Sequence, residues 1–545
     1  MLAVALVFAA LGCGRKDGGL IVLISVDQLG AARLDPALPG GLGRLAREGR
    51  VFRAATVDHA ITHTCPGHLA LVAGRPPGPA GIPANNTIGP RGDEVYCVEA
   101  DPEDAQVIGA APGLGRSPRR IRASTLGDWL TDAHPGARVF SIAGKDRAAI
   151  AMGGASAQAA YWVAEEPGLR MTSSRYYMPA LPAWVDETSR RLTAALPQQW
   201  DHEPESGGPG GPPPSRPDDY PAEVGTFSRT SGHPIARGDP SQLRARARVS
   251  PYLDEYVLEF ATELVARERL GEQEVDLLLL GLSAIDLIGH AYGPESHESA
   301  DALRKLDGWL AVLLDRLEAH LGGRPLIVAL SADHGVLPLP EWLAETGRAT
   351  CPVDGGGRVL SIGPLSALNL ALLEAFPVED GPPRLEISWP QIAVDREWAA
   401  THGIDPDAIL DVVVRELSLE PSIARVWRRS ELIDSADTSE MARLHRASFD
   451  PSSGVDLIVQ VAEGCLIAPA PVGTSHGAPY LYDRAVPLVI RGPGVEPGTS
   501  DAPVRTLDLA PTLAALAGVV PPPDVVGIDL LREPSGGEPP MGSGG

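Results

Sequence analysis

Short apolar runs separated by helical and polar stretches dominate the hydrophobic pattern of the chain. Runs rich in leucine, isoleucine and valine predict buried strands at 20–26, 138–143, 276–283, 325–332, 456–461 and 486–491. Helical patterns lie between them, and the clearest one places leucines on one face with charges opposite, at Leu303, Leu306, Leu310, Leu313 and Leu317. Strands that alternate with helices and crossovers predict an α/β fold, with a mostly parallel central sheet and helices on both faces.

Three segments depart from this alternation. Residues 162–251 form a long insert that we expect to act as a cap, and its part 206–217, SGGPGGPPPSRP, predicts a flexible surface excursion. A second insert, 346–449, has strand and helix signals of its own and predicts a small αβ subdomain. The tail 534–545 is rich in glycine and proline and is expected to be disordered. One catalytic domain is therefore expected over 19–533.

The N-terminus, MLAVALVFAALGCGRKDGG, contains an apolar run that is too short to cross a membrane and is typical of a signal peptide. A small residue precedes Cys13 and polar residues follow it, which resembles a bacterial lipoprotein signal with Cys13 as the lipidated first residue. We therefore expect residues 1–18 to be a signal and linker. The protein is expected to be exported, either free in the bacterial periplasm or anchored to a membrane through a lipid at Cys13.

Composition and charge narrow the classes of partner. The chain has 545 residues, of which 44% are hydrophobic, so it can form a large core. Its formal net charge of -24 argues against a nucleic-acid partner, because such proteins need a basic surface. The same charge repels anionic substrates, so cations close to the site must attract them.

Four cysteines follow the N-terminal segment, at positions Cys65, Cys97, Cys351 and Cys465. An oxidising compartment would permit a disulfide, for example between Cys97 and Cys351. The sequence leaves the pairing open, because spacing alone does not assign connectivity.

Metal-binding residue types follow several of the predicted strands. The candidates are Asp27 after the first strand, Asp286 and His290 in the spacing D-x-x-x-H, Asp333 and His334, and His476 in a glycine-rich loop. Each of them alone is more often a turn former, a helix cap or an exposed residue. Together they predict one site, because the carboxyl ends of strands in an open α/β sheet meet at one edge. Three carboxylates and three imidazoles suit two borderline divalent ions, zinc above all.

Thr64 is the candidate nucleophile. It precedes an apolar run that predicts a helix, and a hydroxyl at a helix N-terminus lies among free backbone N–H groups that also stabilise an anion. A bound metal ion would activate this weak nucleophile by favouring the alkoxide. In isolation a plain N-cap explains Thr64 equally well. The nearby His59, His63 and His68 are interpreted as local packing or hydrogen-bonding groups.

The chain resembles the alkaline phosphatase superfamily over nearly its full mature length, and it is most similar to the PafA-type alkaline phosphatases. The matching motifs are VDQ at 26–28, T-x-x-GH at 64–68, G-x-x-P at 74–77, GI-x-x-N at 81–85, GKDR at 144–147, D-x-x-x-H at 286–290, ADHG at 332–335 and SHG at 475–477. Two positions differ from the family pattern. Ala80 stands where a histidine is common, and Asn86-Thr87 follow Asn85 where an aromatic residue is frequent.

The resemblance implies a role for each candidate. One zinc ion would be held by Asp286, His290 and His476, and the other by Asp27, Asp333, His334 and the oxygen of Thr64. The non-bridging oxygens of the transferred phosphoryl group would contact Asn85, Lys145 and Arg147. Because two asparagines stand side by side, it stays open whether Asn85 or Asn86 makes the contact.

These roles predict a metal-dependent phosphate monoester hydrolase. Thr64 would form a phosphothreonine intermediate, the cofactors would be two Zn²⁺ ions or other divalent ions, and the substrates would be small phosphorylated molecules. A phosphodiesterase or nucleotide pyrophosphatase with the same metal site is the alternative. The paired cations Lys145 and Arg147 favour the monoester, because a terminal phosphate carries more charge than a diester.

Three further classes are disfavoured. A sulfatase would need C-x-P-x-R, whereas Cys65 begins Cys-Pro-Gly-His. A cobalt- or manganese-dependent mutase would carry serine in place of Thr64 and would not be exported. A binding lipoprotein on a degenerate scaffold would be expected to have lost ligands or the nucleophile, and all candidate positions keep usable chemistry.

Overall fold

The computed structural model describes residues 18–165, 168–202, 216–379, 381–434 and 436–532. The expected signal segment with Cys13, the tail 534–545 and most of the run 206–217 lie outside these described residues. Among the helices that are described, none combines the length and the hydrophobicity needed to cross a membrane.

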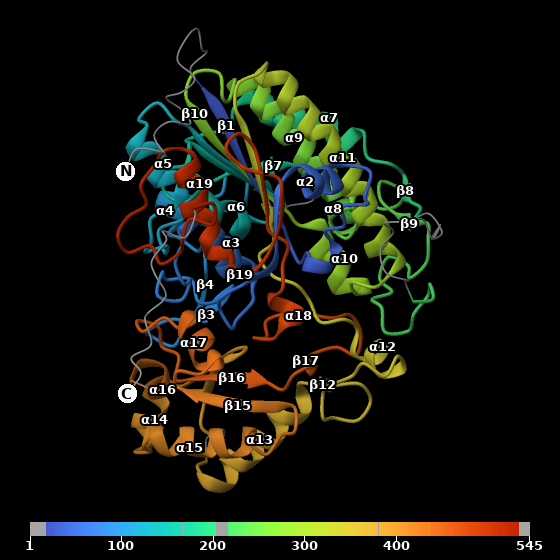
Figure 1. The fold of residues 1–545 in the computed structure, drawn as a ribbon. Coiled ribbons are helices and arrows are strands. Elements are labelled where there is room, and N and C mark those ends of the chain that lie inside the picture. The colour runs from blue at the N-terminus through green and yellow to red at the C-terminus, as the bar shows by residue number, and fades with distance from the viewer. Residues whose placement is uncertain (1–17, 166–167, 203–215, 380, 435, 533–545) are drawn as a thin grey trace, which may run out of the picture.

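A nine-stranded sheet forms the centre of the molecule, in the order β19-β2-β18-β11-β1-β10-β5-β6-β7 (Figure 1). Its strands are β1 Gly19–Val26, β2 Arg50–Thr56, β5 Val139–Ala143, β6 Ala159–Val163, β7 Met171–Thr172, β10 Val275–Leu282, β11 Leu326–Ser331, β18 Val489–Arg491 and β19 Gly498–Arg505. Parallel pairing joins β1 to β10 and β11, β10 to β5, β5 to β6, and β2 to β19. Only β18 and β7 pair antiparallel within this sheet, as far as the structure is described. The predicted mostly parallel sheet is confirmed.

Helices cover both faces of this sheet. Because side chains alternate along a strand, Leu20 and Val22 of β1 lie in one hydrophobic core, whereas Ile21 and Leu23 lie in the other. The first core is covered by α2 Gly41–Glu48, α7 Ala183–Ala194, α8 Leu243–Arg248, α9 Tyr252–Glu268, α10 Ala284–Tyr292 and α11 His297–Leu321. The second core is covered by α3 Thr64–Ala73, α5 Leu126–Ala133, α6 Asp146–Gly153 and α19 Leu509–Leu516. The predicted leucine face belongs to α11 and packs into the first core.

A separate four-stranded antiparallel sheet lies beyond one end of the central sheet (Figure 1). Its order is β13 Leu385–Ser388, β14 Gln391–Val394, β16 Leu457–Val461 and β15 Ile423–Arg428. A third hydrophobic cluster joins it to α13 Ile362–Ala375, α14 Arg396–His402 and α15 Pro406–Leu417. The predicted strand at 456–461 therefore belongs to this sheet and not to the central one. Its apolar pattern predicts a strand but carries no information about which strand is its neighbour.

Smaller elements connect these layers. They are β3 Asn86–Ile88, β4 Glu94–Tyr96, α4 Pro102–Ala105, β8 Gln199–Trp200, β9 His233–Pro234, α12 Pro340–Glu345, β12 Arg358–Leu360, α16 Arg429–Asp434, α17 Glu440–Ala447, β17 Leu466–Ala468 and α18 Leu481–Arg484. Antiparallel pairing joins β3 to β4 and β8 to β9, whereas β12 and β17 are parallel.

The insert that contains β8 and β9 lies against α10 and the loop that carries His476. The amide of Val224 donates to the carbonyl of Ala291, and the amide of Gly473 donates to the carbonyl of Ala222. Arg216, near the end of the run 206–217, is only 1% exposed and bonds to the Glu223 carboxylate and the Tyr292 carbonyl. Arg216 is therefore not part of a surface excursion, because its guanidinium is bound between the insert and the end of α10.

Candidate active site

The predicted metal ligands converge at the carboxyl edge of the central sheet. Asp27 follows β1 directly, Asp286 lies in the first turn of α10 after β10, and Asp333 follows β11. Their strands are neighbours in the order β11-β1-β10, so the sheet topology brings the three carboxylates together. All three are buried, at 0 to 2% exposure.

Asp286, His290 and His476 form one group of possible ligands. His290 Nε2 lies 3.3 Å from Asp286 Oδ1, because one helical turn of α10 places the two residues on the same face. His476 Nε2 approaches the same oxygen from its loop, at 3.5 Å. Two imidazoles and one carboxylate in this arrangement can hold a divalent metal ion.

Backbone carbonyls orient the three predicted histidine ligands. The Nδ1–H groups of His290, His476 and His334 donate to the carbonyls of Thr474, Thr62 and Gly335, at 2.8, 2.6 and 3.0 Å. A carbonyl can only accept, so these contacts fix the proton on Nδ1 and leave Nε2 with its lone pair. Metal-bound histidines have this second hydrogen bond almost without exception.

A buried carboxylate, Asp483, holds the His476 loop in place. Its Oδ2 accepts from the amides of Gly477 and Ala478, both at 2.8 Å, and from the Thr62 hydroxyl at 3.0 Å. Burial, and then the electrostatic effect of the neighbouring His334 ring, lowers the pKa of His476 to about 4. His476 is therefore neutral at pH 7, as a metal ligand must be. The sequence did not reveal the role of Asp483, because this residue is not part of any motif with the spacing of metal ligands.

Asp27, His68 and Asp333 form a second group. His68 Nε2 lies 3.0 Å from Asp27 Oδ1, and its Nδ1 lies 3.3 Å from Asp333 Oδ2. His334 Nε2 approaches the same Asp333 oxygen at 3.1 Å. The Nδ1–H of His68 also donates to the carbonyl of Thr64 at 2.8 Å, one helical turn earlier. His68 is the hydrogen-bonding group that the sequence predicts, but the sequence did not reveal its contact with both carboxylates.

Unpartnered polar atoms indicate that this second group fits a cation. Among the described residues, Asp27 Oδ1, Asp333 Oδ2, His68 Nε2 and His334 Nε2 are buried and have no hydrogen-bond partner of acceptable geometry. Buried carboxylate oxygens and imidazole nitrogens without partners cost free energy, and coordination of a metal ion removes that cost. The two carboxylates and the histidines have the donor chemistry of a zinc site.

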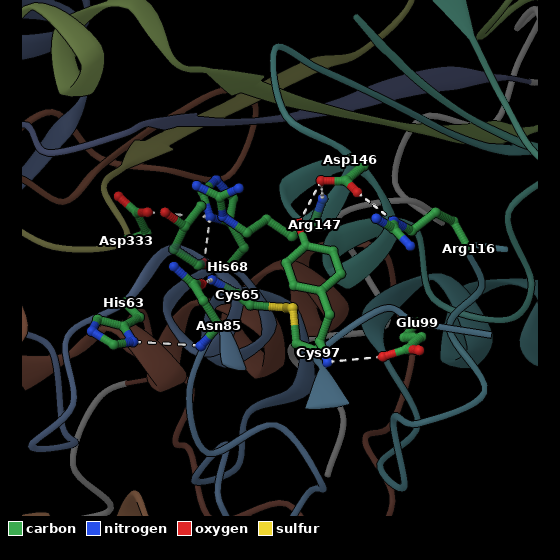
Figure 2. The surroundings of a disulfide bond; sticks show 12 residues. His63, Cys65, His68, Asn85, Cys97, Glu99, Arg116, Asp146, Arg147 and Asp333 are labelled. Carbon is green, nitrogen blue, oxygen red and sulfur yellow. Dashed lines mark hydrogen bonds and ion pairs between the residues drawn. A yellow bond between two sulfur atoms is a disulfide. The ribbon is translucent and has the colours of Figure 1, made fainter. Parts of the chain in front are cut away.

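Thr64 is the first residue of α3 and is 1% exposed. The amide of the next residue, Cys65, donates to Asn85 Oδ1 at 2.8 Å, so the Asn85 side chain lies at the N-terminus of the same helix (Figure 2). Asn86 instead donates to Glu94 on β4 at 3.1 Å. Of the two candidate asparagines, only Asn85 is therefore placed beside Thr64.

A disulfide between Cys65 and Cys97 holds this region together (Figure 2). The amide of Cys97 donates to the Asn85 carbonyl at 2.9 Å, so the bridge fixes Asn85 against the start of α3. The second disulfide joins Cys351 to Cys465. The pairing of Cys97 with Cys351 considered from the sequence is wrong, because the fold brings each of them close to a different cysteine.

Lys145 precedes α6 and is 3% exposed. Its Nζ donates to Asp27 Oδ2 at 2.8 Å and to Asp286 Oδ2 at 2.5 Å, so the ammonium lies between the two groups of ligands. Burial alone would lower the pKa of Lys145, but attraction to these two carboxylates raises it above its usual value. Lys145 is therefore positively charged at all physiological pH values.

Arg147 is the second residue of α6, and its backbone amide is bound by Asp146. The Asp146 carboxylate accepts from the Arg147 amide at 2.7 Å, from the Tyr96 hydroxyl at 2.6 Å and from Arg116 Nε at 2.7 Å (Figure 2). Burial opposes the charge of Arg147, but the negative potential of Tyr96 and Asp146 outweighs burial and raises its pKa. Lys145 and Arg147 thus place two permanent positive charges at this end of the sheet.

Comparison with known proteins assigns the family. The type I phosphodiesterase / nucleotide pyrophosphatase family matches residues 21–365 of the chain. The chain belongs to this family. The family is part of the alkaline phosphatase superfamily that the motifs predict, and the chain is an enzyme of that superfamily.

Two curated relatives and one solved structure extend the match beyond the family region. Alkaline phosphatase PhoK of Sphingomonas is 31% identical over 93% of this chain and 89% of its own length. Alkaline phosphatase PhoD of Zymomonas mobilis is 31% identical over 91% of this chain and 85% of its own length. The crystal structure of alkaline phosphatase PafA superposes with a TM-score of 0.84, at 24% identity, over 95% of this chain and 99% of that chain. The predicted fold class is confirmed.

Gln28 connects the two groups of ligands in this phosphodiesterase-family chain. Its amide donates to Asp333 Oδ1 at 3.1 Å, and its side-chain Nε2 donates to Asp286 Oδ1 at 2.8 Å. Its φ of 67° lies in the left-handed region, which is uncommon for a residue other than glycine. Such strained backbone concentrates at functional sites, because the surrounding contacts must compensate for its cost. The family motif VDQ contains Gln28, although sequence analysis gave it no role.

Proposed function

We propose that the chain hydrolyses phosphate monoesters through a phosphothreonine intermediate at Thr64, with the help of two zinc ions. The observation that carries this proposal is the placement of Lys145, whose Nζ contacts one carboxylate from each group of ligands. A phosphoryl group that lies between the two sets of metal ligands must therefore contact the Lys145 ammonium. Asp286, His290 and His476 would hold one ion, and Asp27, Asp333, His334 and Thr64 the other. His68 supports the second group through its contacts with Asp27 and Asp333.

The bound ions would supply Lewis-acid stabilisation of the entering and leaving oxygens and would favour the Thr64 alkoxide. The chain itself supplies the remaining groups. Thr64 lies at the N-terminus of α3, where backbone N–H groups and the helix dipole stabilise an anion. The Oδ1 of Asn85 is occupied by the Cys65 amide, so its NH₂ group is free to donate to a phosphoryl oxygen. Lys145 and Arg147 neutralise the dianionic phosphate.

In the first step the Thr64 oxygen attacks phosphorus, and the bond between phosphorus and the leaving-group oxygen breaks. The hydroxyl proton of Thr64 is lost to solvent, and the leaving alkoxide takes a proton from water. In the second step a water molecule hydrolyses the phosphothreonine, which releases inorganic phosphate and restores the hydroxyl. Catalysis then rests on positioning and charge stabilisation of a loose transition state.

A phosphodiesterase is the second candidate, and one observation favours it. A cleft of ≈ 140 Å³ opens beside His63 and His476, with Trp389, Pro390 and Ile458 from the second sheet in its wall. A diester carries a second organic substituent, and an apolar wall next to the metal site is where such a substituent would bind. The leaving group of a monoester could use the same cleft, so the substrate preference must be measured.

Export is part of the same proposal. The two disulfides form and persist in an oxidising compartment such as the bacterial periplasm. Small phosphorylated molecules outside the cytoplasm would be the substrates. Lipid attachment at Cys13 is proposed only from the sequence, because that residue lies outside the described part of the chain.

The test compares zinc-reconstituted turnover of an aryl phosphate monoester with that of its methyl diester. We expect the wild type to prefer the monoester, and Lys145→Ala/Arg147→Ala to lose about 100-fold in monoester kcat/KM with a much smaller loss for the diester. The matched control Arg119→Ala/Arg120→Ala also removes two charges, but from the surface outside the site, and should keep the wild-type ratio. Preference for the diester would make the enzyme a phosphodiesterase. Near-normal turnover of Thr64→Ala would refute the phosphothreonine.

A further inference from the structure

A second cluster of buried histidine and carboxylate side chains lies outside the active site. It consists of His202 after β8, His233 at the start of β9, and Glu298 in the first turn of α11. Their exposed fractions are 8%, 2% and 1%. The cluster therefore joins two strands of the insert to a helix that packs against the central sheet, and the mechanism proposed above uses none of its members.

The ligand atoms of this cluster have the spacing of a tetrahedral metal site. His233 Nε2 lies 3.2 Å from Glu298 Oε1, and His202 Nε2 lies 3.8 Å from the same oxygen. Asp218 adds a fourth group, with its Oδ1 at 3.7 Å from His202 Nε2. Ligands bound to zinc at about 2.0–2.2 Å with tetrahedral angles stand roughly 3.4 Å from one another. The observed separations therefore bracket the separation that a bound zinc ion requires.

Hydrogen bonding leaves these atoms without partners. Within the described residues, both ring nitrogens of His202, Nε2 of His233 and Oε1 of Glu298 are buried and have no hydrogen-bond partner of acceptable geometry. Such a group of unpaired polar atoms costs free energy unless something binds them. The other nitrogen of His233, Nδ1, lies 3.3 Å from both the Tyr292 hydroxyl and the Phe227 carbonyl. These contacts orient the ring so that Nε2 faces Glu298, the second-layer arrangement that supports metal-bound histidines.

The local charges favour a cation in the middle of the cluster. No lysine or arginine among the described residues lies within 4 Å of the Glu298 carboxylate, whose close neighbours are the two histidine rings. The nearby guanidinium of Arg216 is bound to Glu223 instead. Among the described residues, the buried carboxylate of Glu298 thus has no permanent positive partner. Two imidazoles in the ligand set favour zinc over calcium or magnesium, which prefer oxygen ligands.

We propose that His202, His233 and Glu298 bind a structural zinc ion, with Asp218 as the fourth ligand. This ion is a third metal ion, in addition to the two of the active site. It ties β8 and β9 to the start of α11 and so fixes the insert beside α10, which carries Asp286 and His290. Its role is mechanical, because in the described part of the chain no hydrogen bond or ion pair joins these four residues to those around Thr64.

Zinc content of the purified full-length chain, measured by plasma mass spectrometry, tests the proposal. The wild type should hold three zinc ions per chain, and Glu298→Gln and His202→Asn should each hold two. Both variants should unfold at a lower temperature than the wild type. A chelator that removes this zinc ion should lower the Tm of the wild type, and this decrease should be absent in the two variants. The control His320→Asn alters a histidine on the same helix, bonded to the Leu270 carbonyl, and should keep three ions. Unchanged zinc content in Glu298→Gln would overturn the proposal.

A second measurement needs no variant and separates this site from the catalytic one. Anomalous diffraction from wild-type crystals at the zinc edge should give a peak between His202, His233 and Glu298. Peaks at the active-site carboxylates without a peak here would overturn the structural zinc site and leave the proposed function intact. A peak here without peaks at Asp27 and Asp286 would support the structural site while contradicting the two-zinc catalytic centre. If the three side chains instead form a metal-free ion pair, no peak appears at this position.

Discussion

Replacement of Gly67 by alanine tests whether the contact between α3 and Asp333 sets the geometry of the active site. Gly67 lies in the first turn of α3, three residues after Thr64, and its Cα faces the Asp333 backbone. A Cβ at this position would lie 2.4 Å from the Asp333 carbonyl oxygen and 2.7 Å from the Asp333 Cβ. The Asp333 backbone cannot rotate out of the way as a flexible side chain can. Either α3 or Asp333 must therefore shift.

The magnitude follows from the size of the overlap. Ordinary van der Waals contact for a Cβ begins near 3.4 Å, so relief of the 2.4 Å contact requires a displacement of about 1 Å. Overpacking of this kind costs about 1–3 kcal/mol of stability. If Thr64 and Asp333 have the proposed roles, a displacement of about 1 Å between them costs on the order of 100-fold in rate. We therefore expect Gly67→Ala to lose roughly 100-fold in kcat/KM, with weakened zinc binding at the Asp27 and Asp333 group.

The assay combines kcat/KM for an aryl phosphate, zinc content and thermal unfolding. Gly308→Ala is the matched control, because Gly308 also lies inside a helix, α11, with no atom within 4 Å of its added Cβ. Alanine is a better helix former than glycine, so the control should gain about 0.5–1 kcal/mol and keep its turnover. The reasoning is refuted if Gly67→Ala keeps its turnover within about threefold and its full zinc content, because the close contact would then not position Asp333.

Three further predictions concern other parts of the chain. Asn85→Ala should lose about 100-fold in monoester kcat/KM, whereas Asn86→Ala should stay within twofold; equal effects would contradict the assignment of Asn85. Cys65→Ala/Cys97→Ala opens a loop with a sequence separation of 32 and should lose about 4 kcal/mol in urea unfolding; an unchanged midpoint would mean that the bridge is not formed. Burial lowers the pKa of His445 to about 4, below its unfolded value near 6.5, so its contribution to stability is complete above pH 6.5 and is lost as the pH falls towards 4. The loss should reach about 3 kcal/mol and should be absent in His445→Gln, and a wild-type unfolding free energy that is flat between pH 6.5 and 4 would count against it.

The sequence alone predicted the fold class, which is confirmed, and most residues of the candidate site. Leucine- and valine-rich runs located β1, β5, β10 and β11 within one or two residues, because buried parallel strands are apolar on both faces. Asp27 and Asp333 could be placed in one site because they lie just beyond the ends of adjacent parallel strands, whose carboxyl ends share an edge. The local sequence pattern is enough to place a side chain wherever its position follows from the helix or strand that carries it.

The tertiary structure decided what depends on contacts between distant segments. The disulfide partner of Cys97, the sheet that receives the strand at 457–461 and the contacts of His68 with two carboxylates were all outside the reach of local pattern. The cluster of His202, His233 and Glu298 combines residues from two strands and a helix, with no motif spacing to connect them. The local sequence gives hydrophobic periodicity and residue type. Which distant residues come into contact depends on how the helices and strands pack, and this is visible only in the folded chain.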